Sequence, residues 1–311
     1  MMALPSPSNG AVPTTAAPPP NEKMVTAASS SVPHAHSSGS GAPDSPQNYE
    51  FLSVIGSGSF GRICKVKRIR DGAVLARKEI EYRRMKDKER QQLVQEVNIL
   101  RDLRHPNIVR YLSRYVDRGN YVINIIMEYC EGGDLSRVIK LHRQTQKYIS
   151  EETIWTYFAQ LAAALHECHH VYGGRMGEPG AVLHRDIKPD NVFLDSLNNA
   201  KLGDFGLSTL VMANHERNFA KTFVGTPFYM SPELVREQSY NEKSDIWSLG
   251  CLLYELCALE PPFRGQTHRQ LNDAILNVRY PDIPRMYSDS MRAMIRRMLQ
   301  LAVRRSFHVW I

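Results

Sequence analysis

Residues 184–206, which read HRDIKPDNVFLDSLNNAKLGDFG, constrain the fold and chemistry of this chain more than any other feature. They place an ionised carboxylate, a lysine and two potential metal ligands on two short loops. The order and spacing predict that Asp186 accepts or orients a hydroxyl proton and that Lys188 contacts a transferring phosphate. Asn191 and Asp204 are predicted to bind Mg²⁺. Either triplet, His-Arg-Asp or Asp-Phe-Gly, is a weak signal alone, but together at this spacing they indicate phosphoryl transfer.

The composition is compatible with a large globular core and narrows the choice of partners. The chain has 311 residues, 42% of them hydrophobic, and this length suggests one or two domains. A net charge of +7 could favour the binding of nucleic acid, of a membrane surface or of acidic phosphate ligands. No long basic run, zinc-ligand spacing or aromatic–basic repeat is present, so we predict no nucleic-acid partner.

The sequence shows no recognisable export signal or membrane-spanning segment. The N-terminus lacks a basic patch followed by an apolar core, and the most apolar later stretch, residues 246–259, is too short. We therefore predict a core helix there and no membrane partner. The cysteines never form a Cys-x-x-Cys pair, which is typical of reduced thiols in the cytoplasm and nucleus. They are Cys64, Cys130, Cys168, Cys251 and Cys257.

Residues 1–48 differ in composition from the rest of the chain. They are rich in Pro, Ser, Ala, Thr and Gly and contain no aromatic residue. Such a segment buries too little apolar surface to offset its ordering entropy, so we predict a disordered tail. Ser45, which precedes a proline, is a candidate for phosphorylation, although a plain flexible tail is the simpler interpretation.

A glycine-rich segment follows the tail and lies between two predicted strands. Residues 49–55 alternate as a strand, residues 56–61 read Gly-Ser-Gly-Ser-Phe-Gly, and residues 63–67 form a second strand. The same glycine spacing followed by a helix would indicate a dinucleotide-binding fold. Because a strand follows instead, we predict a hairpin whose backbone amides approach the phosphates of ATP. A glycine-rich hairpin without a ligand is the structural alternative.

A lysine on the next strand and a glutamate on the next helix are predicted to form an ion pair. Lys78 lies on the strand at 74–80, and Glu96 borders the apolar face of a helix at 91–103. The pair would hold the lysine on the α- and β-phosphates of ATP. A strand lysine without this partner would normally be a solvated charge.

Residues 123–130 predict a buried strand that leads into a hinge. Met127 would stand at the back of an adenine pocket, although it could equally be an ordinary core residue. The backbone of Glu128 and of Cys130 would form hydrogen bonds with the adenine edge. Asp134 falls where a contact with a ribose hydroxyl is expected.

The C-terminal half is predicted to be helical. Residues 152–169 carry apolar side chains at helical spacing, and we assign no chemistry to the polar residues 172–180 that follow. Asp245 lies at the start of the apolar core helix. It is predicted to accept hydrogen bonds from the backbone of the catalytic loop and to fix the shape of that loop.

In series, these motifs resemble those of the eukaryotic protein kinases from residue 49 to about residue 301. The resemblance implies a bilobal α+β fold, with a small β-rich N-lobe and hinge at 49–130 and a larger helical C-lobe at 131–311. It also implies that ATP and Mg²⁺ are bound and that proteins are the substrates. Nucleotide contacts are expected from Ile55, Gly56, Gly58, Gly61, Ile63, Ala76, Lys78, Met127, Glu128, Cys130, Asp134 and Phe193.

Within this superfamily the sequence is similar to the serine/threonine kinases. Lys188 and Pro189 follow the catalytic aspartate as they do in that class, and Thr226 matches the residue that faces the substrate hydroxyl. Residues 127–136, MEYCEGGDLS, and 219–235, FAKTFVGTPFYMSPELV, more narrowly resemble the NIMA-related kinases, fungal NIMA in particular.

The resemblance to the NIMA-related kinases implies a role in mitotic entry and cell-cycle control. It also implies a location in the cytoplasm and nucleus and a preference for an apolar residue three positions before the target Ser or Thr. An activating phosphate is expected at Thr222, where it would pair with Arg185. Another copy of the chain would add this phosphate during transient self-association.

The sequence departs from the family pattern at its end. The family continues with an Asp-Pro-x-x-Arg-Pro segment and a final helix, whereas residues 301–311 read LAVRRSFHVWI. We therefore expect a C-lobe that is truncated and lacks the usual final helix, and a Glu233 that lacks its arginine partner.

Two function classes remain open. The first is an active Mg-ATP-dependent serine/threonine kinase, and the second is a catalytically silent kinase-like module that binds nucleotide or partners. Loss of Lys78, Asp186 or Asp204 would favour the silent module. All three are present, which favours the active enzyme.

Overall fold

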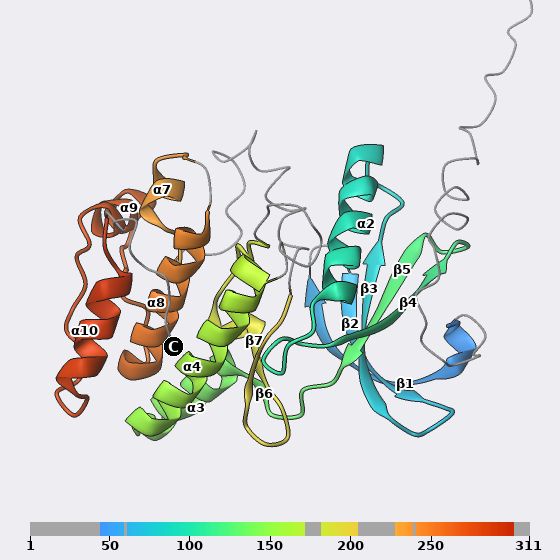
Figure 1. Cartoon of the computed structure of the whole chain (residues 1–311), viewed down its shortest axis with the longest axis horizontal. Coiled ribbons are helices and arrows are strands. Elements are labelled where there is room, and N and C mark those ends of the chain that lie inside the picture. The colour runs from blue at the N-terminus through green and yellow to red at the C-terminus, as the bar shows by residue number, and fades with distance from the viewer. Residues whose placement is uncertain (1–43, 59–60, 172–181, 205–227, 239–240, 302–311) are drawn as a thin grey trace, which may run out of the picture. The chain divides into compact units, whose positions relative to one another are not determined.

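The computed structural model describes residues 44–58, 61–171, 182–204, 228–238 and 241–301. Within these segments the side chains of residues 58, 88, 89, 92, 95, 96, 99 and 171 are not described. Strands dominate the earlier part of the described chain and helices the later part (Figure 1). The predicted α+β fold, with a β-rich N-lobe and a helical C-lobe, is therefore confirmed.

Five antiparallel strands form the N-lobe sheet in the order β1-β2-β3-β5-β4. They are β1 (Tyr49–Gly58), β2 (Gly61–Arg68), β3 (Val74–Glu81), β4 (Tyr111–Asp117) and β5 (Val122–Glu128). β1 and β2 form a hairpin whose pairing extends to Gly58 and Gly61. This confirms the predicted strand–glycine–strand arrangement, and the dinucleotide-binding alternative, which needs a helix after the glycines, is wrong.

The alternation of side chains along the strands gives this sheet two apolar faces. One face buries a cluster around Cys64 and Val66. The other buries Ile80 against Leu93 of helix α2 (Asp87–Asp102). The helix predicted at 91–103 therefore exists and packs through its apolar side, but it begins earlier, at Asp87.

The segment between α2 and β4 is hydrogen-bonded to β8 (Ala200–Leu202), a strand that lies much later in the sequence and belongs to the C-lobe. Leu202 N donates to Asn107 O at 2.8 Å, and Val109 N donates to Leu202 O at 2.9 Å. The buried side chain of Asn107 donates to Ala200 O at 2.9 Å. These bonds join the N-lobe to the strand that carries Asp204.

A second, three-stranded sheet positions the functional loops. It consists of β6 (Gly133–Asp134), β7 (Val192–Leu194) and β8. The 3₁₀ turn η4 (Pro189–Asn191) leads directly into β7, and β8 leads directly into Gly203 and Asp204. The antiparallel pairing of β7 with β8 therefore brings the two halves of the opening sequence motif together.

Helices make up most of the C-lobe. They are α3 (Leu135–Thr145), α4 (Glu151–His166), α7 (Pro232–Val235), α8 (Glu242–Ala258), α9 (His268–Leu276) and α10 (Asp289–Met298). α8 is buried along nearly its whole length and packs against α4 and α10, which confirms the predicted core helix (Figure 1). Among the helices of the described segments, none is both long and apolar enough to cross a membrane.

The boundaries of three predicted segments need comment. α4 ends at His166 rather than at residue 169, because the π-helical turn η3 (Glu167–Val171) replaces its last turn. The 3₁₀ helix η2 (Pro46–Asn48) forms within the segment predicted to be a disordered tail. Residues 1–43, 172–181 and 302–311 lie outside the described residues. The structure therefore does not test the disorder predicted for most of the tail or the expected loss of the final helix.

Candidate active site

The catalytic loop brings Asp186, Lys188 and Asn191 into direct contact. Lys188 Nζ donates to Asp186 Oδ2 at 2.7 Å. Asn191 Nδ2 donates to the same oxygen and to the backbone carbonyl of Asp186, both at 2.7 Å. Because its amide nitrogen is used in this way, Asn191 has its amide oxygen available for a cation. The side chain of Asp186 is 36% exposed and is therefore accessible to a substrate.

Asp245, on α8, fixes the shape of the loop. Its buried carboxylate accepts hydrogen bonds from the backbone N–H groups of His184 and Arg185, each at 3.0 Å. His169 Nε2 lies 2.8 Å from the same carboxylate. Arg185 has a left-handed backbone (φ 69°), which persists only where the surroundings hold it. These contacts confirm the role predicted for Asp245.

His184 connects the catalytic loop to the segment that carries Asp204. The backbone N–H of Asp186 donates to His184 Nδ1 at 3.3 Å, so Nε2 carries the ring proton. Nε2 donates to Gly203 O at 2.8 Å, and Gly203 N donates to Asn191 O at 2.9 Å. The general-base residue and the candidate metal ligands therefore belong to one hydrogen-bonded unit.

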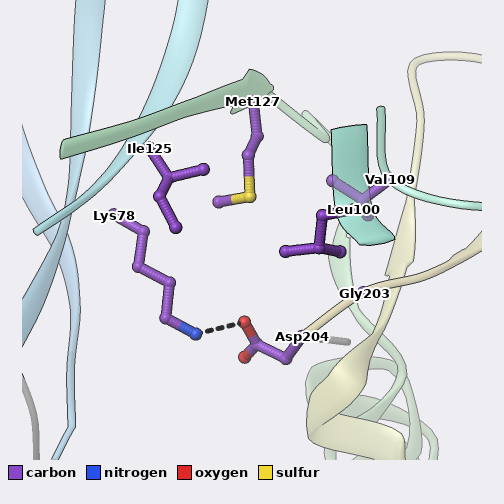
Figure 2. A pocket seen from close by; sticks show the side chains of 7 residues that line it. All are labelled: Lys78, Leu100, Val109, Ile125, Met127, Gly203 and Asp204. Atoms are coloured by element: carbon purple, nitrogen blue, oxygen red, sulfur yellow. Dashed lines mark hydrogen bonds and ion pairs between the residues drawn. The ribbon is translucent and has the colours of Figure 1, made fainter. Parts of the chain in front are cut away.

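Lys78 and Asp204 form an ion pair across the site. Lys78 Nζ lies 2.6 Å from Asp204 Oδ1, and Figure 2 shows the two side chains pointing toward each other. Burial alone would raise the pKa of the Asp204 carboxyl, but the ammonium groups of Lys78 and Lys188 and the ring of His184 together keep it below the usual value. Asp204 is therefore ionised at neutral pH and able to bind a cation.

A pocket lies beside this ion pair (Figure 2). Its remaining lining residues are Leu100, Val109, Ile125, Met127 and Gly203. The apolar side chains come from α2, β5 and the segment before β4, all in the N-lobe, whereas Gly203 and Asp204 come from the C-lobe. Met127 is among the lining residues, while its predicted place at the back of an adenine pocket stays a prediction.

Gly203 allows the ring of Phe193 to lie close to the backbone in front of Asp204. A Cβ at Gly203 would lie 2.6 Å from Phe193 Cε2. Phe193 is half-buried on β7, and Ala76 is buried on β3, which is paired with β5 at Met127. Ala76 therefore lies beside Met127 and Phe193 lies beside Gly203, while the contacts of both residues with the nucleotide stay predictions.

The glycine-rich hairpin has a backbone that only glycine fits at its far end. Gly61 has φ 153°, and a Cβ there would overlap the backbone carbonyl oxygen of Glu79 on β3. Ile55 is 46% exposed on β1, and Ile63, on β2, is half-buried beside Gly56. The predicted nucleotide contacts of this hairpin, Gly58 included, are not tested by the structure.

Glu128, the first residue of the hinge, is held in place by two hydrogen bonds that its side chain accepts. Glu128 Oε1 accepts from Arg110 N at 2.7 Å and from Lys201 Nζ at 3.1 Å. Lys201, on β8, also donates to Pro106 O at 2.8 Å. Lys201 therefore joins the hinge, the segment before β4 and the strand that leads to Asp204.

Cys130 and Asp134 continue the hinge. Burial, together with the nearby Glu128 carboxylate, raises the pKa of the Cys130 thiol to about 12, so this thiol is protonated and unreactive. Asp134 caps α3, since its Oδ1 accepts from Arg137 N at 2.8 Å. The ribose contact predicted for Asp134 would have to use the other carboxylate oxygen.

Several predicted residues lie outside the described part of the chain. The backbone of Glu96 is on α2, but its side chain is not described, so the predicted pair with Lys78 is not tested. Thr222 and Thr226 also lie outside the described residues. Glu233, which was expected to lack an arginine partner, accepts a hydrogen bond from the hydroxyl of Ser244 at the start of α8.

Sequence reasoning missed Lys201 and His169. Both are buried or nearly so, and each contacts a group that is far away in sequence, so neither spacing nor periodicity signals its role. The only local sign was their position, because Lys201 lies three residues before Asp204 and His169 lies at the end of a predicted helix.

The described residues fit a magnesium site of the kind that uses the substrate's phosphates. Mg²⁺ in such enzymes is bound through one or two carboxylates together with phosphate oxygens and water. Asp204 supplies an ionised carboxylate, and Asn191 supplies an amide oxygen. In the described segments no group of three or more His, Cys, Asp or Glu side chains is placed to hold a metal by itself.

A carboxylate beside a lysine, a candidate metal ligand joined to it by hydrogen bonds and a pocket lined by residues of two lobes define a phosphoryl-transfer class of protein. The family model described as "Protein kinase domain" matches residues 49–306, and the chain belongs to this family.

The relatives of this chain are NIMA-related kinases. It is 52% identical to "Serine/threonine-protein kinase Nek2" of Homo sapiens over 260 residues, which cover 83% of this chain and 57% of that protein. It is 47% identical to "G2-specific protein kinase nimA" of Emericella nidulans over 267 residues, which cover 79% of this chain and 38% of that protein. The resemblance to the NIMA-related kinases is therefore confirmed. The chain matches little more than half the length of Nek2.

Proposed function

We propose that this chain is an ATP-dependent protein serine/threonine kinase, which transfers the γ-phosphoryl group of Mg-ATP to hydroxyl groups of proteins. The observation that carries the proposal is the hydrogen-bonded unit of Asp186, Lys188, Asn191 and Gly203 next to the Lys78–Asp204 pair. Membership of the protein kinase domain family and the names of the relatives support it.

In the proposed reaction Asp186 accepts the proton of the substrate hydroxyl while that oxygen attacks the γ-phosphorus. The bond between the γ-phosphorus and the oxygen that bridges it to the β-phosphate breaks, and ADP leaves. Lys188 lies within hydrogen-bond distance of Asp186 and so is placed to neutralise charge on the transferring group. Lys78 now donates to Asp204, and in the nucleotide complex it would donate to the α- and β-phosphates instead. The hinge backbone at Glu128 and Cys130 would hold the adenine.

We further propose that Mg²⁺ is the metal cofactor and that Asp204 and Asn191 hold it. When bound, the ion neutralises negative charge on the phosphates. Asp204 has the ionised state that this role needs, because Lys78 and Lys188 keep the pKa of its carboxyl low.

The relatives suggest a cellular role. The names "Serine/threonine-protein kinase Nek2" and "G2-specific protein kinase nimA" support the choice of serine and threonine and a role in cell-cycle and mitotic control. The absence of disulfides among the described cysteines is compatible with the proposed location in the cytoplasm and nucleus. The proposed partners are protein substrates and, transiently, a second copy of the chain, with no nucleic acid and no membrane.

The proposed regulation is phosphorylation of Thr222 by that second copy. Asp245 holds the backbone of Arg185 in place, so the guanidinium of Arg185 starts from a fixed position to pair with a phosphate. Thr226 is assigned to the substrate hydroxyl instead. Phosphopeptide mapping of active enzyme should find phosphate on Thr222, and full activity in Thr222→Ala would contradict this regulation.

Transfer of labelled phosphate from Mg-ATP to casein tests the proposed function. We expect turnover by the unaltered chain and loss of at least about 10²-fold in Asp204→Ala, since a proposed carboxylate ligand of Mg²⁺ is removed. The matched control is Asp190→Asn, which alters an exposed carboxylate on the turn η4 beside Asn191 and should retain activity. Equal, background turnover in the unaltered chain and Asp204→Ala would support the silent kinase-like module instead.

A further inference from the structure

Two exposed histidines at the C-terminal end of α4 lie outside the proposed active site. His166 is the last residue of α4, and His170 lies in the π-helical turn η3. Their imidazole rings are 4.9 Å apart between centroids and nearly parallel, with 20° between the ring planes. Both side chains are exposed to solvent, so both rings can reach an ion there.

The spacing and the backbone at this point are those of a ligand site. Two histidines four residues apart on one helical face are the arrangement that binds Zn²⁺ on helices. π-helical turns are rare, and single ones are frequently found at functional sites. The π turn here also carries His169, whose Nε2 is 2.8 Å from the buried Asp245 carboxylate.

A carboxylate charge lies near the two rings, because Glu242, the first residue of α8, acts electrostatically on His170. No third His, Cys, Asp or Glu of the described segments completes a metal cluster, so water would fill the remaining positions.

We propose that His166 and His170 bind one divalent cation of the zinc and copper class. Imidazole suits Zn²⁺, Cu²⁺ and Ni²⁺, whereas Mg²⁺ prefers oxygen ligands. This site is therefore distinct in ligands and in metal from the proposed magnesium site at Asp204 and Asn191. The bound ion links the end of α4 to the π turn and so stabilises the turn that places His169 on Asp245.

Calorimetric titration of Zn²⁺ into the nucleotide-free full chain tests the proposal. The double variant His166→Gln/His170→Gln should bind Zn²⁺ at least about tenfold more weakly than the unaltered chain, because both ligands are lost. The matched control is His34→Gln/His36→Gln, which removes a closely spaced histidine pair elsewhere in the sequence and should bind as the unaltered chain does. Equal affinity in the first double variant, or loss of binding only in the control, would overturn the site.

Thermal unfolding gives a second readout of the same site. Saturating Zn²⁺ should raise the midpoint of the unaltered chain and of the control, but not that of His166→Gln/His170→Gln. If that variant does not fold, electron paramagnetic resonance of Cu²⁺ bound to the unaltered chain replaces the comparison. Couplings from two imidazole nitrogens are expected, and a spectrum with oxygen ligands alone would overturn the proposal.

Discussion

Lys78 makes the contact that most directly prepares the site for a nucleotide. Its ammonium pairs with a carboxylate 126 residues away in sequence, and it lies at the edge of the pocket in Figure 2. The pair keeps Asp204 ionised, since the ammonium opposes the effect of burial on the pKa of that carboxyl. One residue thus orders both the phosphate site and the candidate metal ligand before any nucleotide binds.

Lys78→Met should separate binding from chemistry. The methionine keeps the length of the side chain but removes the charge that aligns the phosphates, so single-turnover transfer should fall by at least about 10²-fold. ATP binding, measured by titration calorimetry, should change much less, because the contacts proposed for the adenine lie in the hinge and not at Lys78. Lys65→Met, on the neighbouring strand, is the control. Retained transfer in Lys78→Met would contradict the role given to Lys78.

A second residue-scale effect concerns Glu255 and Tyr229. Burial raises the pKa of the Glu255 carboxyl, while the hydrogen bond from Tyr229 and the charge of Arg143 lower it. Tyr229→Phe removes that hydrogen bond, so the pKa of Glu255 should rise further. A carboxyl with a raised pKa in the folded state contributes stability at low pH, and this contribution is lost as pH rises through that folded pKa.

We therefore expect the midpoint of thermal unfolding to fall more steeply in Tyr229→Phe than in the unaltered chain when the pH is raised from about 5 to about 8. Differential scanning calorimetry at both pH values measures the difference in midpoint. Tyr148→Phe, which alters an exposed tyrosine, should show the same pH dependence as the unaltered chain. A pH dependence in Tyr229→Phe equal to that of the unaltered chain would show that the hydroxyl does not act on Glu255.

At the scale of elements, β8 connects more parts of the site than any other strand described. It pairs with β7 on one side, receives bonds from the segment before β4 on the other, and continues into Gly203 and Asp204. Gln160 of α4 also accepts from Ala200 N at 2.7 Å. The position of Asp204 therefore depends on contacts from both lobes.

Asn107→Ala should weaken this attachment measurably. The substitution leaves the buried carbonyl of Ala200 without its side-chain donor, which costs about 1–3 kcal/mol of unfolding free energy. Urea unfolding measures the loss. Asn120→Ala breaks a comparable side-chain bond in an exposed turn and should change stability by no more than about 0.5 kcal/mol. Equal losses in the two variants would mean that burial of the Asn107 bond has no special weight.

What the sequence predicted correctly depended on local patterns. Alternation predicted the β1–β2 hairpin and helical periodicity predicted α2, because burial on one face determines both patterns. The apolar stretch at 246–259 predicted the buried α8. The short spacing between Asp186 and Asn191 likewise sets their contact. The predicted end of α4 at residue 169 was wrong, since apolar periodicity does not distinguish an α-helical last turn from a π-helical one.

Contacts between distant segments were not available from such patterns. The bond between Lys201 and Glu128 depends on how β8 meets the hinge, and that between His169 and Asp245 on how α4 meets α8. The spacing of residues along the chain also could not predict the ion pair between Lys78 and Asp204. Only the resemblance to protein kinases indicated that these motifs come together in one site.

At the scale of the whole molecule, the two lobes share one site. The N-lobe supplies Lys78 and the glycine-rich hairpin, and the C-lobe supplies the catalytic loop and Asp204. The bonds of Lys201 and Asn107 hold these contributions together across the boundary. The central claim is that this shared site phosphorylates serine and threonine, with Asp186 as the base.

Analysis of the phosphorylated amino acid in the product tests this claim most directly. The unaltered chain, given Mg-ATP and a peptide containing Ser, Thr and Tyr with an apolar residue three positions before each, should yield phosphoserine and phosphothreonine. Asp186→Asn should lower the rate by about 10²–10⁴-fold, since the general base is lost. Phosphotyrosine alone, or an equal rate of transfer in Asp186→Asn, would contradict the claim.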